Sequence, residues 1–218
     1  MIDVSVIITN YNRVSLIGRA IRSCLKQSLE RDKYEIIVID DASTDDSKEV
    51  ILEFGDQIKP IFLKENIGVA DASNVGIKKA IGAFIIRVDS DDYIGEHTLL
   101  IMSEILTNNP DIGFVYPDHL LVDENEKVLE RIKLGTLDDL YSHGAGIMFR
   151  KSNLEAIGLY DPKLRNAEDR DLLKRYIKNF DGYHIKLPLY RYRQWAGNIT
   201  KDIAERKKWE QKVNGNNS

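Results

Sequence analysis

The sequence predicts an α/β fold in which a mostly parallel central sheet is flanked by helices. Short runs of β-branched and other apolar residues recur along the first half of the chain, and segments of helical periodicity separate them. This alternation of strand and helix is typical of parallel sheets with helices on their faces. The length of 218 residues favours one domain, because domains commonly have about 100–200 residues.

Four strands and three helices are expected in the first half. The predicted strands are Val4–Thr9, Ile36–Ile39, Ile61–Leu63 and Phe84–Val88. The predicted helices have their apolar faces at Leu16–Leu25, Val50–Phe54 and Ala72–Ile81. Pro60 suggests that the third strand lies at an edge, since proline cannot donate to a neighbouring strand. We expect Ser43 to cap the second helix, Gly68 to open the third and Gly82 to close it.

The second half of the chain is less regular. The expected order is a helix, a strand, a hairpin, a strand, two helices and an extended aromatic segment: Leu99–Leu106, Ile112–Tyr116, Leu120–Ile132, Ile147–Arg150, Leu154–Ile157, Arg170–Lys178 and Tyr183–Tyr192. Gly158 is predicted to end the first of the two later helices. Because no linker rich in Pro, Gly or Ser interrupts the chain, residues 1–218 are expected to form a single domain. Its parts are the halves 1–117 and 118–200 and a charged tail at 201–218.

The charge balance disfavours nucleic acid as a partner. The chain has 35 acidic and 31 basic residues, a net charge of −4 and a pI of about 5.7, whereas general polyanion binders are basic. No apolar run approaches the ~20 residues of a membrane span, and the N-terminus lacks the pattern of a signal peptide. We therefore expect a cytoplasmic protein. The single cysteine, Cys24, excludes an intrachain disulfide and is expected in the core.

Acidic and amide side chains follow three of the predicted strands, in the segments Asn10–Arg13, Asp40–Asp41 and Asp89–Asp92. Each segment alone could simply form a turn or cap a helix. Ligands of open α/β sheets bind beyond the carboxyl ends of the strands, however, and aspartates gathered at one edge would repel one another. The pattern therefore predicts a cation at this edge. A hard divalent ion that bridges a phosphate fits such oxygen ligands best.

The same segments resemble the ordered motifs of family 2 glycosyltransferases with the GT-A fold. The resemblance rests on Ser5–Arg13, Val38–Asp45, Asn66–Gly68 and Asp89–Asp92, and it continues through Gly146–Arg150, Glu168–Asp169 and Tyr192–Arg193. It covers roughly residues 3–200, and the order and spacing of the motifs are far more specific than any one motif. The resemblance implies a Rossmann-like GT-A domain. Its half 1–117 would bind the nucleotide sugar, and its smaller, irregular half 118–200 would bind the acceptor.

The resemblance implies an inverting glycosyltransferase of the hexosyltransferase type. Such an enzyme moves a sugar from a nucleotide-diphosphate sugar, most often a UDP-sugar, to an acceptor hydroxyl. The expected acceptor is a saccharide or a lipid-linked or protein-linked group in bacterial-type polysaccharide or glycoconjugate synthesis. A basic helix in the tail Lys201–Lys212 could also contact anionic lipid at the inner face of the membrane, although a solvated helix explains its charges as well.

The triplet Asp89-Ser90-Asp91 matches the DXD metal motif of that family. Asp91 would be the main ligand of Mn²⁺ or Mg²⁺, and Asp89 would lie near the ribose or the metal. Asp92 is adjacent and competes with Asp91 for the same role, so the register stays open. A metal at this position would stabilise the negative charge that builds on the leaving nucleotide diphosphate.

The resemblance also implies which groups hold the base and take the proton. Tyr11 and Asp41 match positions that hold the base, with Asp41 accepting from a base N–H. Asp169 matches the general base that deprotonates the acceptor hydroxyl, although acids at this place could also simply begin a helix. The candidate substrate-binding residues are Thr9, Tyr11, Asn12, Arg13, Asp41, Asn66, Gly68, Asp89, Ser90, Glu168, Arg193 and Trp195. Of these, Arg13 could meet a phosphate or simply face solvent.

The chain departs from the family pattern at Trp195. Family members often have a histidine three residues after the tyrosine that is here Tyr192, and in some members that histidine contacts the metal or the diphosphate. Trp195 could stack on a sugar or simply pack, and Arg191 or Arg193 could supply charge to the diphosphate. His143 is a further candidate for a donor or acceptor contact, because its loop precedes an acceptor-side strand.

Two other function classes stay open. A sugar-phosphate nucleotidyltransferase has a similar nucleotide-binding sheet, but it should carry a glycine-rich basic loop after the first strand. Here no glycine occurs before Gly18, which argues against that class. A nucleotide-sugar-binding module without turnover would need a lost base or metal site. Both sets of acids are present, but the missing histidine keeps this alternative open.

Overall fold

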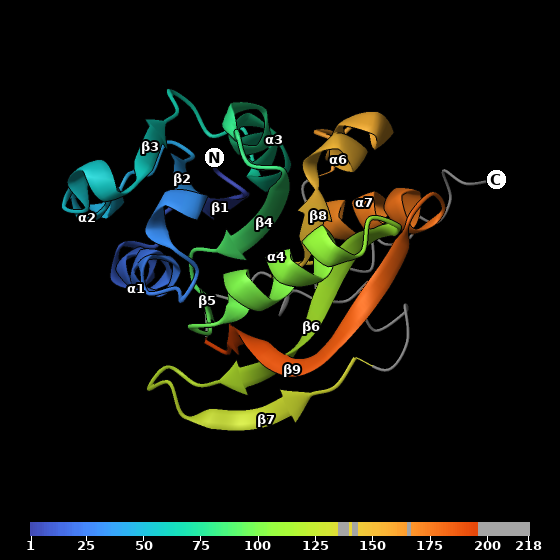
Figure 1. Cartoon of the computed structure of the whole chain (residues 1–218). Helices are drawn as coiled ribbons and strands as arrows, with labels where there is room; N and C mark the ends of the chain where they lie inside the picture. The colour runs from blue at the N-terminus through green and yellow to red at the C-terminus, as the bar shows by residue number, and fades with distance from the viewer. Residues whose placement is uncertain (135–139, 141–143, 165–166, 196–218) are drawn as a thin grey trace.

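The computed structural model describes residues 1–134, 140, 144–164 and 167–195, and the strands in this part form one curled sheet (Figure 1). Their order is β3-β2-β1-β4-β8-β6-β9-β5, with β7 paired to β6. The strands are β1 (Val4–Asn10), β2 (Tyr34–Asp40), β3 (Lys59–Phe62), β4 (Phe84–Asp89), β5 (Tyr93–Ile94), β6 (Ile112–Val122), β7 (Val128–Ile132), β8 (Met148–Arg150) and β9 (Asp181–Arg193).

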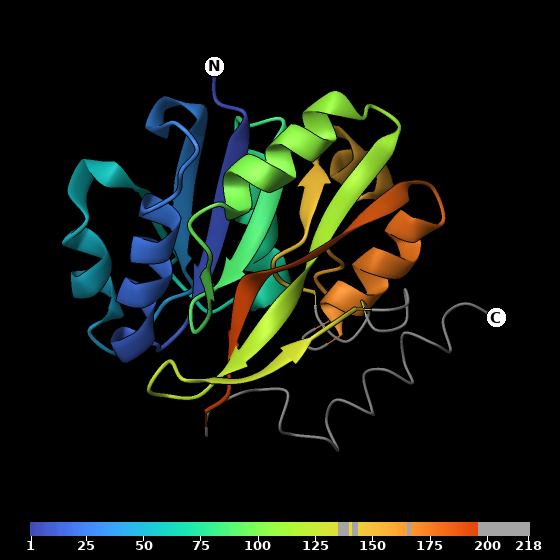
Figure 2. The ribbon, with the colours of Figure 1, turned by 60° about the horizontal axis from the view of Figure 1, so that its bottom comes forward.

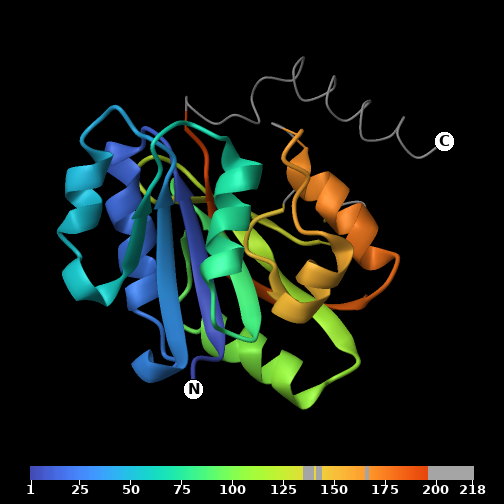
Figure 3. The same ribbon diagram turned by 90° about the horizontal axis from the view of Figure 1, so that it is seen from above.

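Helices cover both faces of the sheet. They are α1 (Val14–Leu25), α2 (Ser47–Leu52), α3 (Val69–Lys79), α4 (Thr98–Asn108), α6 (Lys151–Ile157) and α7 (Glu168–Ile177). One face packs against α1, α2 and α4 through a core that includes Ile21 and Met102. The other face packs against α3, α6 and α7 through a core that includes Ile77 and Leu173. Figure 2 shows α1 and α4 in front of the strands, and Figure 3 shows α3 across the sheet from α1. This layering confirms the predicted α/β class.

The parallel half of the sheet runs from β3 to β4. β1 pairs in parallel with β2 and β4, and β2 pairs in parallel with β3, as the alternation of strand and helix predicted. Beyond β4 the sheet is mixed, because β8 is antiparallel to β4 and β6 whereas β9 runs parallel to β6. After a helical crossover the next strand runs parallel to the previous one, whereas a hairpin makes the next strand antiparallel. The sheet is therefore mostly parallel in the first half and mixed as a whole.

Several predicted details of the fold are confirmed. β6 and β7 form the expected hairpin, in which the N–H of Asp123 donates to the carbonyl of Lys127. The extended aromatic segment is β9, which pairs along β6. β3 lies at the end of the sheet, as Pro60 suggested, and Cys24 is fully buried. α6 ends at Gly158, whose φ is +91°, a left-handed conformation that glycine adopts easily.

Two predicted helix boundaries are wrong. Ser43 does not cap α2, which begins at Ser47; its hydroxyl instead donates to the carboxylate at the end of β2 (2.6 Å). Gly82 does not end α3 either, since that helix ends at Lys79. A Cβ atom at Gly82 would lie 2.7 Å from the backbone nitrogen of Ser5. The glycine therefore allows a close approach to β1 rather than a helix end.

Some predictions concern residues outside the described part of the chain. These are the tail helix at 201–212, its contact with lipid, and the role of His143. Among the helices in the described part, none is long and apolar enough to cross a membrane. The division into a donor half and an acceptor half at residue 117 stays a prediction.

Candidate functional site

The polar ends of β1, β2 and β4 lie at one edge of the sheet. In the parallel register Thr9 is opposite both Ile39 and Asp89, and Asn10 is opposite Asp40. Because neighbouring strands are about 4.8 Å apart, the loops that follow these strands start side by side. The candidate site is built from these loops, from the loop before α3 and from the N-terminus of α7.

Hydrogen bonds connect the loop after β1 with the loop after β2. Asn10 Nδ2 donates to Asp40 Oδ1 (2.9 Å), and the Ser43 hydroxyl donates to the same oxygen (2.6 Å). The backbone N–H of Asn12 donates to Ser43 Oγ (2.9 Å), and Asn12 Oδ1 accepts from the backbone of the second loop (2.7 Å). Tyr11 lies between Asn10 and Asn12 in the chain and is 44% exposed. The two loops are therefore preformed, and they leave the Tyr11 side chain open to solvent.

Asp41 ties the second loop to the start of α3. Its two carboxylate oxygens accept the backbone N–H groups of Ile67 (2.8 Å) and Gly68 (2.9 Å). Asn66 Nδ2 donates to the Asp41 carbonyl (3.2 Å). Gly68 has a φ of +88°, which favours glycine. Asp41 is only 3% exposed. Its hydrogen bonds hold in place the loop before α3, which contains Asn66 and Gly68.

The chain turns sharply after β4, where the N–H of Asp92 donates to the Asp89 carbonyl (3.0 Å). The Asp92 carboxylate is buried and accepts from the Tyr190 hydroxyl (2.8 Å) and from the backbone N–H of Arg193 (2.8 Å). The side chains of Asp89 and Asp91, by contrast, are 31% and 19% exposed. Asp92 therefore supports this acidic turn from inside, whereas Asp89 and Asp91 reach the surface of the site.

Trp195 and Arg13 lie against Asp91. The Trp195 indole N–H donates to Asp91 Oδ2 (3.0 Å), and Arg13 Nε lies 4.0 Å from the same oxygen. The Arg13 guanidinium also stacks on the Trp195 ring, 4.9 Å from its centre. The tryptophan that replaces the family histidine is thus in direct contact with the predicted metal ligand. Ser90, the middle residue of the motif, is buried.

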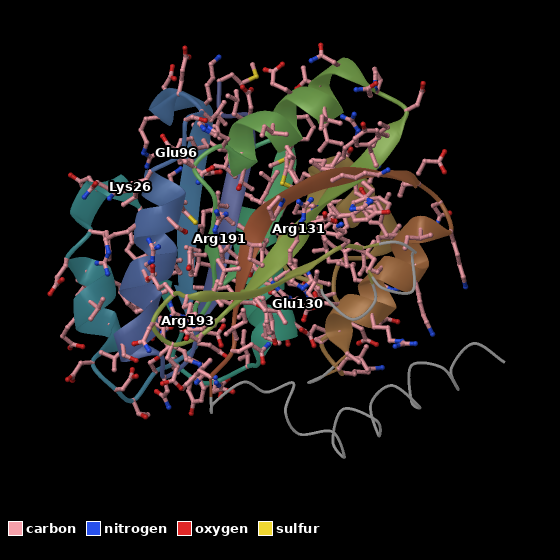
Figure 4. All side chains as sticks on the ribbon, turned by 90° about the horizontal axis from the view of Figure 1, so that it is seen from below. Lys26, Glu96, Glu130, Arg131, Arg191 and Arg193 are labelled. Atoms are coloured by element: carbon pink, nitrogen blue, oxygen red, sulfur yellow. The ribbon has the colours of Figure 1, made fainter. Side chains whose placement is uncertain are left out.

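Arg193 braces the backbone of the acidic turn. It lies at the end of β9 (Figure 4), where its Nε donates to the Asp91 carbonyl (3.1 Å) and its Nη1 donates to the Glu124 carbonyl in the β6–β7 turn (3.0 Å). Arg191, the other candidate for charge, donates to backbone carbonyls of its own strand (3.4 Å). The partly exposed cation beside Asp91 is therefore Arg13 rather than either of these arginines.

The second acidic part of the site is the N-terminus of α7, where Glu168 and Asp169 meet Arg87. Arg87 is buried in β4, and its Nη2 donates to Asp169 Oδ2 (2.6 Å). Its Nη1 lies 3.6 Å from Glu168 Oε1, and its Nε lies 3.2 Å from Asp89 Oδ1. One guanidinium thus joins the acidic turn after β4 to the predicted general base on α7.

Burial and like charges shift the titration of these groups. Burial, followed by repulsion from Asp169, raises the pKa of Glu168 to about 8 against the attraction of Arg87. Burial also raises the pKa of Asp89 to about 6, although Arg87 opposes the shift, and repulsion from Asp91 adds to it. Burial alone would lower the pKa of Arg87, but the surrounding acids, Asp169 first, hold it well above its ordinary value. At neutral pH Glu168 therefore carries a proton in most molecules.

Arg87 is the site residue that the sequence analysis missed. The available signal was a charged residue inside the apolar strand Phe84–Val88. A buried arginine must be paired, so its presence indicated acids facing that strand from elsewhere in the fold. The contributions of Tyr190 and Ser43 were missed as well, because they arise from contacts between distant segments and carry no local pattern.

The donor set after β4 fits a hard divalent cation. Asp89 and Asp91 offer carboxylate oxygens, and their side chains are 31% and 19% exposed. In the described ranges, no group of three or more His, Cys, Asp or Glu side chains converges on one metal position. Mg²⁺ is commonly held by one or two carboxylates together with substrate phosphates. Two carboxylates therefore suffice for an ion that shares a phosphate ligand.

The curled sheet, with its parallel half and its acidic turn after β4, has the architecture of GT-A glycosyltransferases. The structure of S. aureus TarS 1–349 in complex with UDP-GlcNAc is similar with a TM-score of 0.81 at 21% identity, over 97% of this chain and 65% of that one. The Pyrobaculum calidifontis mannosyltransferase PcManGT, in complex with GDP-Man and Mn²⁺, is similar with a TM-score of 0.74 at 18% identity, over 96% of this chain and 62% of that one. At these identities the likeness shows the shared fold.

The family model of Glycosyl transferase family 2 matches residues 5–157, and the chain belongs to this family. An uncharacterized glycosyltransferase of Nostoc sp. is 36% identical over 133 residues, which make up 59% of this chain and 40% of the Nostoc protein. The chain therefore spans less than half the length of that relative.

Proposed function

We propose that this chain is an inverting glycosyltransferase that moves a hexosyl group from a nucleotide-diphosphate sugar to an acceptor hydroxyl. The observation that carries the proposal is the presence of two acidic groups with different surroundings, the acidic turn with Asp89 and Asp91 and the α7 terminus with Asp169. One group suits a metal-bound leaving phosphate, and the other suits proton abstraction. A glycoside hydrolase would instead need two carboxyls facing each other across the sugar, and no metal.

A UDP-sugar is the donor that we favour, because the similar TarS structure holds UDP-GlcNAc. The exposed Tyr11 side chain is available to stack on the base. Asp41 holds the neighbouring loop, and its carboxylate oxygens can each accept a second hydrogen bond from a base N–H. The residues to which we assign donor-binding roles in these loops are Thr9, Tyr11, Asn12, Asp41, Asn66 and Gly68.

Asp91 is the residue that we assign as the main ligand of Mn²⁺ or Mg²⁺, with Asp89 beside it. Asp92 is the weaker candidate, because its carboxylate is buried and already accepts from Tyr190. A bound cation would neutralise the diphosphate as it leaves. Arg13, which is partly exposed beside Asp91, is placed to meet the same phosphates. Ser90 and Arg193 would contribute by keeping the acidic turn in shape, as their burial suggests.

Asp169 is the proposed general base. Its Oδ2 is held by Arg87, whereas its Oδ1 is buried and has no hydrogen-bond partner in the described part of the chain. The Asp169 carboxylate, whose side chain is 20% exposed, would take the proton of the acceptor hydroxyl as the hydroxyl oxygen attacks the anomeric carbon opposite the leaving diphosphate. A single displacement of this kind inverts the anomeric centre. Glu168, mostly protonated at neutral pH, would donate a hydrogen bond to substrate rather than take a proton.

Trp195 is proposed to contact the transferred sugar, because its indole lies beside the metal position and aromatic rings stack on sugar faces. The proposed acceptor is a saccharide or a lipid-linked or protein-linked group in bacterial-type polysaccharide or glycoconjugate synthesis. The reaction would take place in the cytoplasm, with peripheral contact at the inner face of the membrane as part of the same proposal.

Nucleotide release tests the proposed function. Purified protein is incubated with UDP- and GDP-sugars in the presence of Mn²⁺, Mg²⁺ or EDTA, and we expect slow release of one nucleoside diphosphate that stops with EDTA. A thermal-shift series with UDP or GDP and Mn²⁺ identifies the base. Nucleotide binding without turnover of any donor would favour the binding module. Pyrophosphate release from a nucleoside triphosphate and a sugar phosphate would favour a nucleotidyltransferase.

A further inference from the structure

A single buried arginine connects the two acidic groups of the site. Arg87 is 6% exposed and lies in β4, two residues before Asp89. Its nitrogens face three carboxylates on two elements, at 3.2 Å from Asp89, 3.6 Å from Glu168 and 2.6 Å from Asp169. The Tyr160 ring covers the guanidinium at 5.4 Å. The arginine is therefore enclosed by groups from both the donor side and the base side.

Stability alone is a poor explanation for this cluster. Buried ion pairs are weak stabilisers, because the cost of desolvating the charges offsets their attraction. Within the described ranges, Arg87 Nε, Arg87 Nη1 and Asp169 Oδ1 are buried and make no hydrogen bond. A buried polar atom left in this way costs free energy. Such atoms call for a specific explanation, and a functional role is one of the usual ones.

The contacts around Asp169 hold its carboxylate in one orientation. Arg87 donates to Oδ2, whereas Oδ1 is buried without a hydrogen-bond partner among the described residues. The Asp169 side chain as a whole is 20% exposed, so the carboxylate still reaches the site. The raised pKa of Glu168, caused first by burial and then by repulsion from Asp169, leaves that side chain mostly neutral and weakens its competition for the guanidinium. A Cβ atom at Gly144 would overlap the Asp169 carboxyl group, so the backbone packs tightly against it.

We propose that Arg87 is a positioning residue, which sets the place of Asp169 relative to the acidic turn at Asp89. The inference rests on the proposed function. In that reaction the acceptor O–H proton passes to the Asp169 carboxylate while the acceptor oxygen bonds to the anomeric carbon. The bond from that carbon to the diphosphate oxygen breaks, and its electron pair leaves on the phosphate. Arg87 exchanges neither proton nor electrons, and its role is to align the two ends of this displacement.

The test compares Arg87→Lys and Arg87→Gln with a matched control, Arg150→Lys. Lysine keeps the charge but cannot hold two carboxylates with a planar fork, and glutamine removes the charge. Arg150 lies in β8 of the same sheet, and its guanidinium donates to the backbone carbonyls of Ile112 (2.8 Å) and Leu106 (2.6 Å). The control therefore loses structural hydrogen bonds of a half-buried arginine without touching the proposed base.

We expect the kcat of donor turnover to fall about 10–100-fold in Arg87→Lys and further in Arg87→Gln, since misplacing a reacting group by about 1 Å can cost 10²-fold. The Kd for UDP with Mn²⁺, measured by calorimetry, should change by a smaller factor than kcat. Arg87 pairs with Asp89, but Asp91, the main metal ligand that we assign, contacts Trp195 and Arg13 instead. Arg150→Lys should have a lower Tm and an unchanged kcat when it is assayed below that temperature.

Three results would each overturn the inference. The first is an unchanged kcat in both Arg87 variants. The second is a loss of kcat that is matched by an equal loss of UDP affinity, and the third is unfolding of both variants while Arg150→Lys folds. A wild-type protein that neither binds nor releases any nucleotide would instead refute the proposed function, so the two failures are distinguishable.

Discussion

The two sides of the candidate site are held together in different ways. On the donor side, the buried carboxylates of Asp40, Asp41 and Asp92 each accept hydrogen bonds from at least two donors. On the base side, the Arg87 guanidinium is shared by Glu168, Asp169 and, across the site, Asp89. Among the described residues, three buried atoms of Arg87 and Asp169 lack a hydrogen bond, whereas Asn10 Oδ1 is the atom in this state on the donor side. The comparison separates acids that shape the loops, Asp40 and Asp92, from the acid proposed for chemistry, Asp169. Asp41 belongs to both groups, because it holds its loop and its oxygens can still accept from the base as proposed.

The largest expected effect on activity is that of Asp91→Asn, at the proposed metal ligand. Asp92→Asn, at the buried carboxylate beside it, should change stability instead. Asp91→Asn should lower metal-dependent kcat/KM by more than about 10³-fold with little change in stability, since metal stabilisation of a leaving phosphate is worth several kcal/mol. Asp92→Asn should instead cost about 1–3 kcal/mol of unfolding free energy, because it disturbs buried hydrogen bonds to Tyr190 and Arg193. Nucleotide release and urea unfolding are the measurements. A stable Asp92→Asn that has lost metal dependence would reverse the assignment.

Asp169→Asn tests the base side directly. We expect kcat to fall about 10³-fold while the Kd for UDP with Mn²⁺ stays within about 3-fold, because general-base catalysis typically contributes 10²–10⁴. Asp171→Asn is the matched control in the same helical turn, since the Asp171 carboxylate pairs with Arg175 (2.7 Å) on α7. Transfer kinetics and calorimetry decide the outcome. Full transfer activity in Asp169→Asn would refute the role of Asp169 as base.

Gly144→Ala tests whether the position of the Asp169 carboxylate matters, without removing any polar group. The new Cβ atom would overlap the Asp169 carboxyl group and displace it from Arg87. We expect kcat to fall about 10–100-fold with donor affinity unchanged. Gly55→Ala serves as the control, because its Cβ would meet nothing within 4 Å although its φ of +51° makes alanine strained. That control should lose about 1 kcal/mol of stability and keep its kcat, and equal activity in both variants would count against a tightly held base.

Glu168→Gln gives the smallest expected effect and concerns stability. The folded pKa of about 8 lies above the ordinary value of about 4.3, so the folded protein keeps a proton that the unfolded chain has released. Stability from this group is therefore lost as the pH rises from about 4 to about 8. The charged groups facing Glu168 are Arg87 and Asp89 from β4 and Asp169 from α7.

Glutamine resembles the protonated acid, so Glu168→Gln should avoid this loss. We expect it to be more stable than wild type by about 1–3 kcal/mol at pH 8 and to approach wild type near pH 4. Urea unfolding of both proteins at pH 4.5, 6.5 and 8 measures the difference. Parallel pH profiles for the two proteins would show that Glu168 is ionised in the folded state.

Much of the donor side could be predicted from sequence because its signals are local. The strands before Asn10, Asp40 and Asp89 are apolar runs that end at polar residues, and parallel strands with helical crossovers bring such ends to one edge. The base side was harder to predict. Arg87 and Asp169 are 82 positions apart, and no sequence pattern near either residue indicates that they are in contact. The predicted cap at Ser43 was wrong because the Ser43 hydroxyl donates to Asp40, three residues earlier at the end of β2.

By itself, the sequence determined the alternation of elements, the family motifs and the edge at which the acids gather, since hydrophobic period and turn chemistry act over a few residues. Only the tertiary structure decided which aspartates face inward and which remain accessible. It also decided that Trp195, 104 positions after Asp91, donates to that carboxylate, and that a strand arginine reaches the acids of α7. The physical reason is that side-chain direction and burial, which set charge and reactivity, depend on the packing of segments far apart in the chain.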